Sequence, residues 1–268
     1  MTELACLDGR IAPAEETFVP ATDEGLLRGD GVFEVIRIYD GAPFALDDHL
    51  ARIERSAANL RLELPPTELL RAEALQLLAK RGEHFGGALR IVVTRGGRRL
   101  LLTEPLPASS SSDSVRLGVV TFSPTRVLDG IKSLSYAGNM LASRLARERG
   151  FDEALLVTPH GRVLEAPTSS IFWVDQSGTL CTPPLDEHIL ASITRDRVLQ
   201  LLDVEERPAT LDDLRDAAEA FLASTTREVQ AVAAIEDGEL PNVGGERTRE
   251  AAKALQQRIE EELQTVRA

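Results

Sequence analysis

Segments with the pattern of strands alternate with segments with the pattern of helices along the first hundred residues, and this alternation restricts the chain to a mixed α and β fold. The run Gly31–Tyr39 is rich in β-branched and aromatic residues and ends at the turn pair Asp40-Gly41, which predicts a strand entering a hairpin. Residues 47–60 and 69–80 carry apolar side chains at helical spacing. Asp47 or Asp48 is available to cap the first of these two helices.

A second hairpin is predicted in the same part of the chain. Residues 88–94 form a β-branched run closed by Gly96-Gly97, and residues 100–102 have the pattern of the returning strand. The first lobe is therefore expected to be α+β.

Residues 103–114 separate two halves of the chain. They combine two prolines with a run of serines, a composition typical of exposed, flexible connections. We therefore predict a small α+β lobe at 1–106, an interdomain loop at 107–114 and a large lobe, rich in strands, at 115–268. In the large lobe, strands are predicted at 115–122, 154–158, 170–174, 220–223 and 229–234, and helices at 137–149, 189–202 and 247–266.

Charge and residue usage exclude several classes of partner and site. A net charge of −13 argues against nucleic acid or an anionic membrane surface as a partner. Cys6 and Cys181 have no paired spacing and the four histidines have no metal-ligand spacing, so neither a disulfide framework nor a metal site is expected. The first residues lack the pattern of a signal peptide, and no apolar run approaches the roughly 20 residues of a membrane span, so we expect a cytoplasmic protein.

Chemistry that needs a primary amine has few candidates. Only Lys80, Lys132 and Lys253 are lysines among the 30 basic residues. Lys132 lies in a loop that precedes a predicted helix, and a neutral lysine amine facing a cleft can form a Schiff base with an aldehyde cofactor. For any single lysine, a solvated surface position is the usual alternative.

A carboxylate and a hydroxyl-rich turn follow about thirty residues later. Glu165 is predicted to end a strand, and such a carboxylate can keep a pyridine nitrogen protonated because an opposite charge favours the charged form. Ser169 and Ser170, in the turn that follows, supply hydrogen bonds and leave room for a flat ligand. An exposed edge carboxylate and an ordinary surface turn are the alternatives.

Two further segments suit a phosphate group. Residues 191–195 open a predicted helix and residues 223–227 follow a predicted strand, and both combine small residues with hydroxyls. Backbone amides at a helix start together with a threonine hydroxyl form an anion site, although serine and threonine there are more often simple caps. Arg52 could add a charge-assisted contact, against the commoner role of a solvated helix arginine.

Taken together, these motifs resemble the class IV aminotransferase family, the pyridoxal 5′-phosphate (PLP) enzymes of fold type IV. The resemblance spans nearly the whole chain, and it is carried by residues 28–34, 49–52, 193–195 and 224–226 together with Lys132 and Glu165. It implies an α/β protein of two lobes with PLP at their interface.

The resemblance also implies roles for individual residues. Lys132 would be the catalytic residue that forms the Schiff base with PLP, and Glu165 would pair with the pyridine nitrogen. The other implied cofactor contacts are Arg52, Ile193, Thr194 and Thr225 at the phosphate, Tyr136 near the phenolic oxygen, and Ser169 and Ser170. The implied substrate contacts are Phe33, Thr226 and, for a carboxylate, Arg98 or Arg99.

Three departures from the family pattern bear on the substrate. Val35 stands where branched-chain enzymes typically have glycine, Ser170 replaces a usual asparagine, and Ala191 replaces a usual glycine. We expect an aminotransferase that moves an amino group from an amino acid, with a D-amino acid favoured, or from a chiral amine to a 2-oxo acid. Aminodeoxychorismate lyase, which forms 4-aminobenzoate and pyruvate, and a PLP-binding protein without turnover are the alternatives. The resemblance also implies a homodimer.

Overall fold

The strand predicted at 31–39 is present as β3 (Gly31–Tyr39) in the computed structural model, which describes residues 3–107 and 113–267. The chain divides into two units. Unit 1 comprises Met1–Leu106, Gly130–Tyr136 and Ile259–Ala268, and unit 2 comprises Pro107–Asp129 and Ala137–Arg258. Lys132, which the sequence division assigned to the large lobe, thus belongs to unit 1, because its segment pairs with β3. Most of the predicted loop at 107–114 lies outside the described residues.

In its described part, unit 1 contains an antiparallel sheet with the strand order β2-β1-β6-β5-β3-β4. The strands are β1 (Leu4–Leu7), β2 (Arg10–Pro13), β3, β4 (Ala42–Pro43), β5 (Gly87–Thr94) and β6 (Arg99–Glu104). Asp40 and Gly41 join β3 to β4 with φ of 47° and 76°. Left-handed φ at both central residues is what a type I′ hairpin turn requires, so the predicted turn is confirmed.

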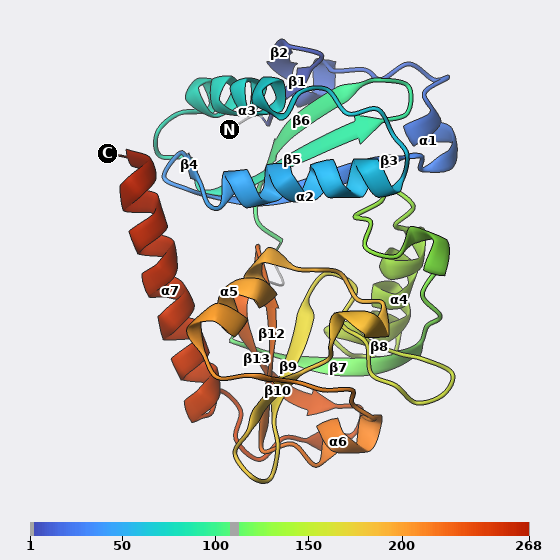
Figure 1. The fold of residues 1–268 in the computed structure, drawn as a ribbon, viewed down its shortest axis with the longest axis vertical. Helices are drawn as coiled ribbons and strands as arrows, with labels where there is room; N and C mark the ends of the chain where they lie inside the picture. The colour runs from blue at the N-terminus through green and yellow to red at the C-terminus, as the bar shows by residue number, and fades with distance from the viewer. Residues whose placement is uncertain (1–2, 108–112, 268) are drawn as a thin grey trace. The chain divides into compact units, whose positions relative to one another are not determined.

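Two helices cover one face of this sheet (Figure 1). They are α2 (Leu46–Asn59) and α3 (Thr67–Arg81), which confirm the predicted helices; a shorter helix, α1 (Glu24–Arg28), precedes β3. Leu50 and Ile53 of α2 pack with Leu77 of α3 and with the sheet in one buried cluster. The predicted aspartate cap is wrong, because Ala45 is the N-cap residue of α2 and makes no side-chain bond. Asp47 and Asp48 instead lie in the first turn, where their negative charges interact favourably with the positive end of the helix dipole.

In its described part, unit 2 contains a mixed sheet with the strand order β11-β10-β9-β12-β13-β7-β8, and β14 pairs with β13. The strands are β7 (Ser114–Thr121), β8 (Glu153–Val157), β9 (Ser170–Val174), β10 (Leu180–Thr182), β11 (Glu205–Glu206), β12 (Glu219–Ser224), β13 (Glu228–Ile235) and β14 (Gly238–Glu239). The helices are α4 (Ala137–Glu148), α5 (Ile193–Leu201), α6 (Leu211–Arg215) and the first part of α7 (Glu246–Arg267), whose residues from Ile259 onward belong to unit 1. The strands predicted from sequence are present.

The helix predicted at 189–202 begins later than expected. His188 has a left-handed φ of 64°, and Ser192 caps α5 by accepting a hydrogen bond from the backbone of Arg195. The helix therefore starts at Ile193, and residues 189–192 form an irregular approach to it. No helix in the described part of the chain is both long and apolar enough to span a membrane.

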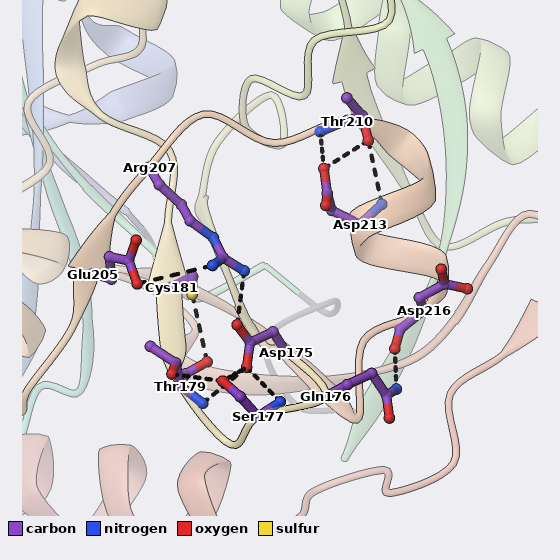
Figure 2. A network of polar contacts seen from close by, with 10 residues as sticks. All are labelled: Asp175, Gln176, Ser177, Thr179, Cys181, Glu205, Arg207, Thr210, Asp213 and Asp216. Atoms are coloured by element: carbon purple, nitrogen blue, oxygen red, sulfur yellow. Dashed lines mark hydrogen bonds and ion pairs between the residues drawn. The ribbon is translucent and has the colours of Figure 1, made fainter.

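A polar network closes the turn between β9 and β10 (Figure 2). Asp175 Oδ1 accepts hydrogen bonds from the backbone and hydroxyl of Ser177 and from the Thr179 backbone, and Arg207 Nη2 lies 2.9 Å from Asp175 Oδ2. These bonds bring the pKa of Asp175 down to about 2. Burial raises the pKa of the nearby Cys181 thiol to about 11, which keeps this thiol protonated and unreactive at neutral pH.

Candidate active site

The backbone around Lys132 is fixed by β3 and α2. Phe33 N donates to Lys132 O at 3.0 Å, Leu134 N donates to Gly31 O at 2.9 Å, and Lys132 N donates to Ser56 Oγ at 3.2 Å. A Cβ at Gly31 would lie 2.6 Å from Leu134 Cδ1 and from Val93 O. Glycine at this position therefore allows the lysine segment to approach the strand closely.

Two aromatic rings lie beside the Lys132 amine. Nζ is 4.5 Å from the centroid of the Phe33 ring and 5.8 Å from that of Tyr136, and the two rings meet edge to face at 5.3 Å. Three residues singled out by the sequence are thus brought together in unit 1. Lys132 is half-buried, unlike the solvated lysine that was the alternative.

A buried charged cluster, Glu34–His49–Arg52, lies on the same elements. Arg52 donates to Glu34 through Nε and Nη2, both at 2.7 Å, and His49 Nδ1 is 2.7 Å from Glu34 Oε2. Burial raises the pKa of Glu34, but the Arg52 guanidinium and His49 outweigh this effect and bring it to about 2. Burial also lowers the pKa of His49, so we take its imidazole as neutral, with Nδ1 donating to Glu34.

This cluster changes the interpretation of Arg52. The side chain is buried and ion-paired, so it is not the solvated helix arginine of the alternative. Its contact with a phosphate stays a prediction. No role for Glu34 or His49 was predicted from the sequence, although a carboxylate within the apolar run of β3 is a signal for a buried pair.

In unit 2, Glu165 lies in an extended segment next to β8. Leu156 N donates to Glu165 O at 2.9 Å, and the Glu165 carboxylate accepts a hydrogen bond from Leu190 N at 3.1 Å. The backbones of Ala166 and Ser169 bond to each other in both directions, which forms the predicted tight turn. The carboxylate is thereby tied to the segment that leads into α5.

Ser169 and Ser170 present the feature of the turn that best fits a ligand. Both hydroxyl groups are buried, and neither finds a hydrogen-bond partner among the residues that the structure describes. Buried polar groups without partners are uncommon because they lose their hydration without compensation. Two such hydroxyls in adjacent residues therefore fit a polar, flat group such as the PLP ring.

The two predicted phosphate segments have the expected local structure. Ile193 and Thr194 begin α5 and are buried behind the Ser192 cap, so backbone amides of a helix start are close to a threonine hydroxyl. Thr225 and Thr226 are half-buried in the turn between β12 and β13. Ser170 pairs with Ala223 across β9 and β12. The two serines and the turn that contains Thr225 and Thr226 therefore lie at the same end of these neighbouring strands.

The predicted carboxylate-binding arginines both have protein partners. Arg98 Nη1 lies 2.8 Å from Asp8 Oδ2. Arg99 contacts the buried carboxylate of Glu73 through Nε and Nη2, at 3.1 and 2.8 Å. These ion pairs attach the β5–β6 turn to its neighbours in unit 1 and lend no support to a substrate contact, which stays a prediction.

Comparisons with known proteins agree with these features. The family model for class IV aminotransferases matches residues 31–235. A putative branched-chain-amino-acid aminotransferase of Methanocaldococcus jannaschii is 35% identical over 257 residues, covering 88% of each chain. A D-alanine aminotransferase of Bacillus licheniformis is 34% identical over 273 residues, covering 94% of this chain and 95% of that protein.

Solved structures share the fold over almost the full length. A branched-chain aminotransferase of Thermoproteus uzoniensis, solved with norvaline, superposes with a TM-score of 0.88 at 29% identity, covering 98% of this chain and 96% of that chain. The PLP-bound form of a hypothetical aminotransferase of Mycobacterium tuberculosis gives 0.86 at 25% identity, covering 96% and 98%. The chain belongs to the class IV aminotransferase family, the PLP-dependent transaminases of fold type IV.

Proposed function

We propose that this transaminase moves an amino group from a D-amino acid to a 2-oxo acid, with Lys132 as the residue that carries PLP. The observation that supports this assignment most directly is the fixed, half-buried position of Lys132 on β3 and α2, beside Phe33 and Tyr136. A lysine whose backbone is bonded on both sides presents its amine at a defined point, as a reaction at that amine requires.

PLP, when bound, supplies a protonated pyridine ring that withdraws electrons from the substrate carbon. Lys132 Nζ would hold the cofactor at its aldehyde carbon and, once freed, would move a proton to and from the substrate carbon. The Glu165 carboxylate, oriented by the Leu190 backbone, holds the proton on the ring nitrogen.

The other predicted contacts divide between the ends of the cofactor. The cofactor ring is contacted by Ser169 and Ser170, whose buried hydroxyls fit a polar partner. Tyr136 lies near the phenolic oxygen of the ring. The α5 start at Ile193 and Thr194 would hold the phosphate together with Thr225 and Arg52. Phe33, Thr226 and Arg98 or Arg99 are the proposed substrate contacts. The resemblance further implies a homodimer, which size-exclusion chromatography with light scattering would test. The cytoplasmic location expected from the sequence stays a prediction.

A branched-chain L-amino acid is the second candidate donor. The Methanocaldococcus jannaschii relative is named a putative branched-chain-amino-acid aminotransferase and is as similar to this chain as the Bacillus licheniformis D-alanine enzyme. Val35 on β3, where branched-chain enzymes typically have glycine, favours the D-amino acid.

Absorbance spectra of the holoenzyme mixed with one donor at a time test the proposal. Without an acceptor, D-alanine should bleach the yellow cofactor, and adding a 2-oxo acid should restore the colour. L-leucine should give a bleaching rate at least about tenfold lower. Lys132→Ala should lose the reaction by about a thousandfold or more, whereas Lys80→Ala, at an exposed position on α3, should react as the wild type does.

Other results would contradict specific parts of the proposal. Faster bleaching by L-leucine would assign the chain to branched-chain amino acids. Pyruvate released from aminodeoxychorismate without an acceptor would establish the lyase. Full activity of Lys132→Ala would overturn the role of Lys132.

A further inference from the structure

Arg227, directly after Thr225 and Thr226 in the turn between β12 and β13, is buried in a hydrogen-bonded network that the reaction does not use. Its side chain is 4% exposed. Nη2 donates to Glu153 Oε2 and Nη1 donates to Gln230 Oε1, each at 2.6 Å. These contacts join the turn to β8 and β13, two strands of the sheet in unit 2.

The partner of Arg227 is held as firmly as the arginine itself. Glu153 is 2% exposed, and its second oxygen, Oε1, accepts from Ser143 Oγ at 2.6 Å and from Ala154 N at 3.0 Å. Both carboxylate oxygens are therefore bonded, which is the condition under which a buried ion pair repays the cost of removing its charges from water. The pair has a fixed geometry and does not rearrange freely.

The backbone of the turn completes the connection. Ser224 pairs with Glu228 across β12 and β13, so the turn consists of Thr225, Thr226 and Arg227. Arg227 N donates to Ser224 Oγ at 3.3 Å. Arg227 is held by hydrogen bonds of both its backbone and its guanidinium, and Ser224 is held in β12. The backbone conformations open to Thr225 and Thr226, which lie between them, are therefore restricted.

We propose that the Arg227–Glu153 ion pair is a positioning device for the cofactor phosphate, because it holds the Thr225 hydroxyl and the backbone amides of the turn in the geometry that binds the phosphate. This inference rests on the proposed function, which assigns Thr225 to the phosphate. Arg227 and Glu153 are positioning residues, because they act on the ligand through the turn. A buried apolar pair of the same volume would fill the space as well, but it would not bond the turn to β8.

Affinities of the full-length chain for PLP and for pyridoxal, which lacks the phosphate, test the inference. Glu153→Gln should raise the dissociation constant for PLP by about tenfold or more and leave the dissociation constant for pyridoxal within about threefold of the wild-type value. Arg227→Lys should have a dissociation constant for PLP between those of Glu153→Gln and the wild type, because a lysine keeps the charge but loses the forked geometry. Ser143→Ala, which removes one bond to Glu153, is a milder variant that tests the same network if Glu153→Gln does not fold.

The control removes another arginine–carboxylate pair of unit 2. Asp175→Asn breaks the contact with Arg207. Asp175 follows the last residue of β9, whereas Ser170, which pairs with Ala223 next to the β12–β13 turn, is the first residue of β9. The control therefore lies at the opposite end of β9 from that turn. This variant should lower the melting temperature and leave the ratio of PLP to pyridoxal affinity unchanged.

Two results would overturn the inference in distinguishable ways. If Glu153→Gln and Ser143→Ala lower the melting temperature but keep the wild-type ratio of affinities, the ion pair is merely structural. If Thr225→Ala also keeps that ratio, or the wild type binds pyridoxal as tightly as PLP, the phosphate assignment of the proposed function fails as well.

Discussion

Glu34 shows how one residue sets the electrostatics next to Lys132, the proposed carrier of the cofactor. It is fully buried within β3, yet Arg52 and His49 occupy both of its oxygens. A carboxylate that receives three such hydrogen bonds stays ionised, and the arginine it holds keeps a fixed orientation on α2. The sequence places Glu34 and His49 in family motifs, but their contact depends on how α2 packs against β3.

Replacing Glu34 by glutamine is expected to destabilise the protein. The change leaves the Arg52 charge buried without its counter-charge, which costs about 3–5 kcal/mol of unfolding free energy at neutral pH. Urea unfolding followed by circular dichroism measures this loss. Glu54→Gln, at an exposed position of α2, the helix that carries Arg52, should change stability by less than about 0.5 kcal/mol.

The same measurement has a defined dependence on pH. The pKa of Glu34 is about 2 in the folded chain, below its usual 4.5, so the folded state binds the proton less readily than the unfolded state does. The stabilisation by the carboxylate is complete above 4.5 and is lost as the pH falls towards 2. The difference between wild type and Glu34→Gln should shrink over that range, and a constant difference would contradict the ionised pair.

At the scale of elements, the β9–β10 hairpin has the two buried serines of the candidate site at one end and the polar Asp175 turn at the other. Ser170 begins β9 and Val174 ends it, so the Asp175 network closes the hairpin away from the two buried serine hydroxyls. The fold therefore separates the residues that stabilise this hairpin from those proposed to bind the cofactor.

Asp175→Asn should lower the free energy of unfolding by about 1 kcal/mol at neutral pH, because the ion pair with Arg207 is lost from a site that solvent partly screens. The pKa of Asp175 is about 2, below the usual 3.8, so the stabilisation is complete above 3.8 and is lost as the pH falls through 2. Thermal unfolding at neutral and acidic pH measures both effects. A wild-type melting temperature in the variant at neutral pH would show that the pair contributes nothing.

Local sequence patterns predicted the long elements and missed the short or irregular ones. β3, β5, α2 and α3 are each eight residues or longer and were predicted within a few residues. β1 and β2 are four residues each, too short for a reliable pattern, and the pairing of β1 with β6 joins residues almost a hundred positions apart. The start of α5 was misplaced because apolar residues before Ser192 continue the helical spacing without forming a helix.

For the whole molecule, the assignment of Lys132 to unit 1 is the feature that local sequence could not provide. The residue follows the serine-rich connection, so its place in the chain suggests the second lobe. The bonds of residues 132–134 to β3 are contacts between segments about a hundred residues apart. The motifs did identify the family, because the type and order of Lys132, Glu165 and the hydroxyl segments are visible in one sequence.

The scarcity of lysine makes the central claim open to a direct measurement. Only Lys80, Lys132 and Lys253 are available as side-chain amines. Treating the holoenzyme with sodium borohydride fixes the cofactor covalently to the amine that carries it, and mass spectrometry of the digested protein then locates the added mass. We predict that the phosphopyridoxyl group is found on Lys132. Finding it on Lys80, on Lys253 or on no lysine would contradict the account.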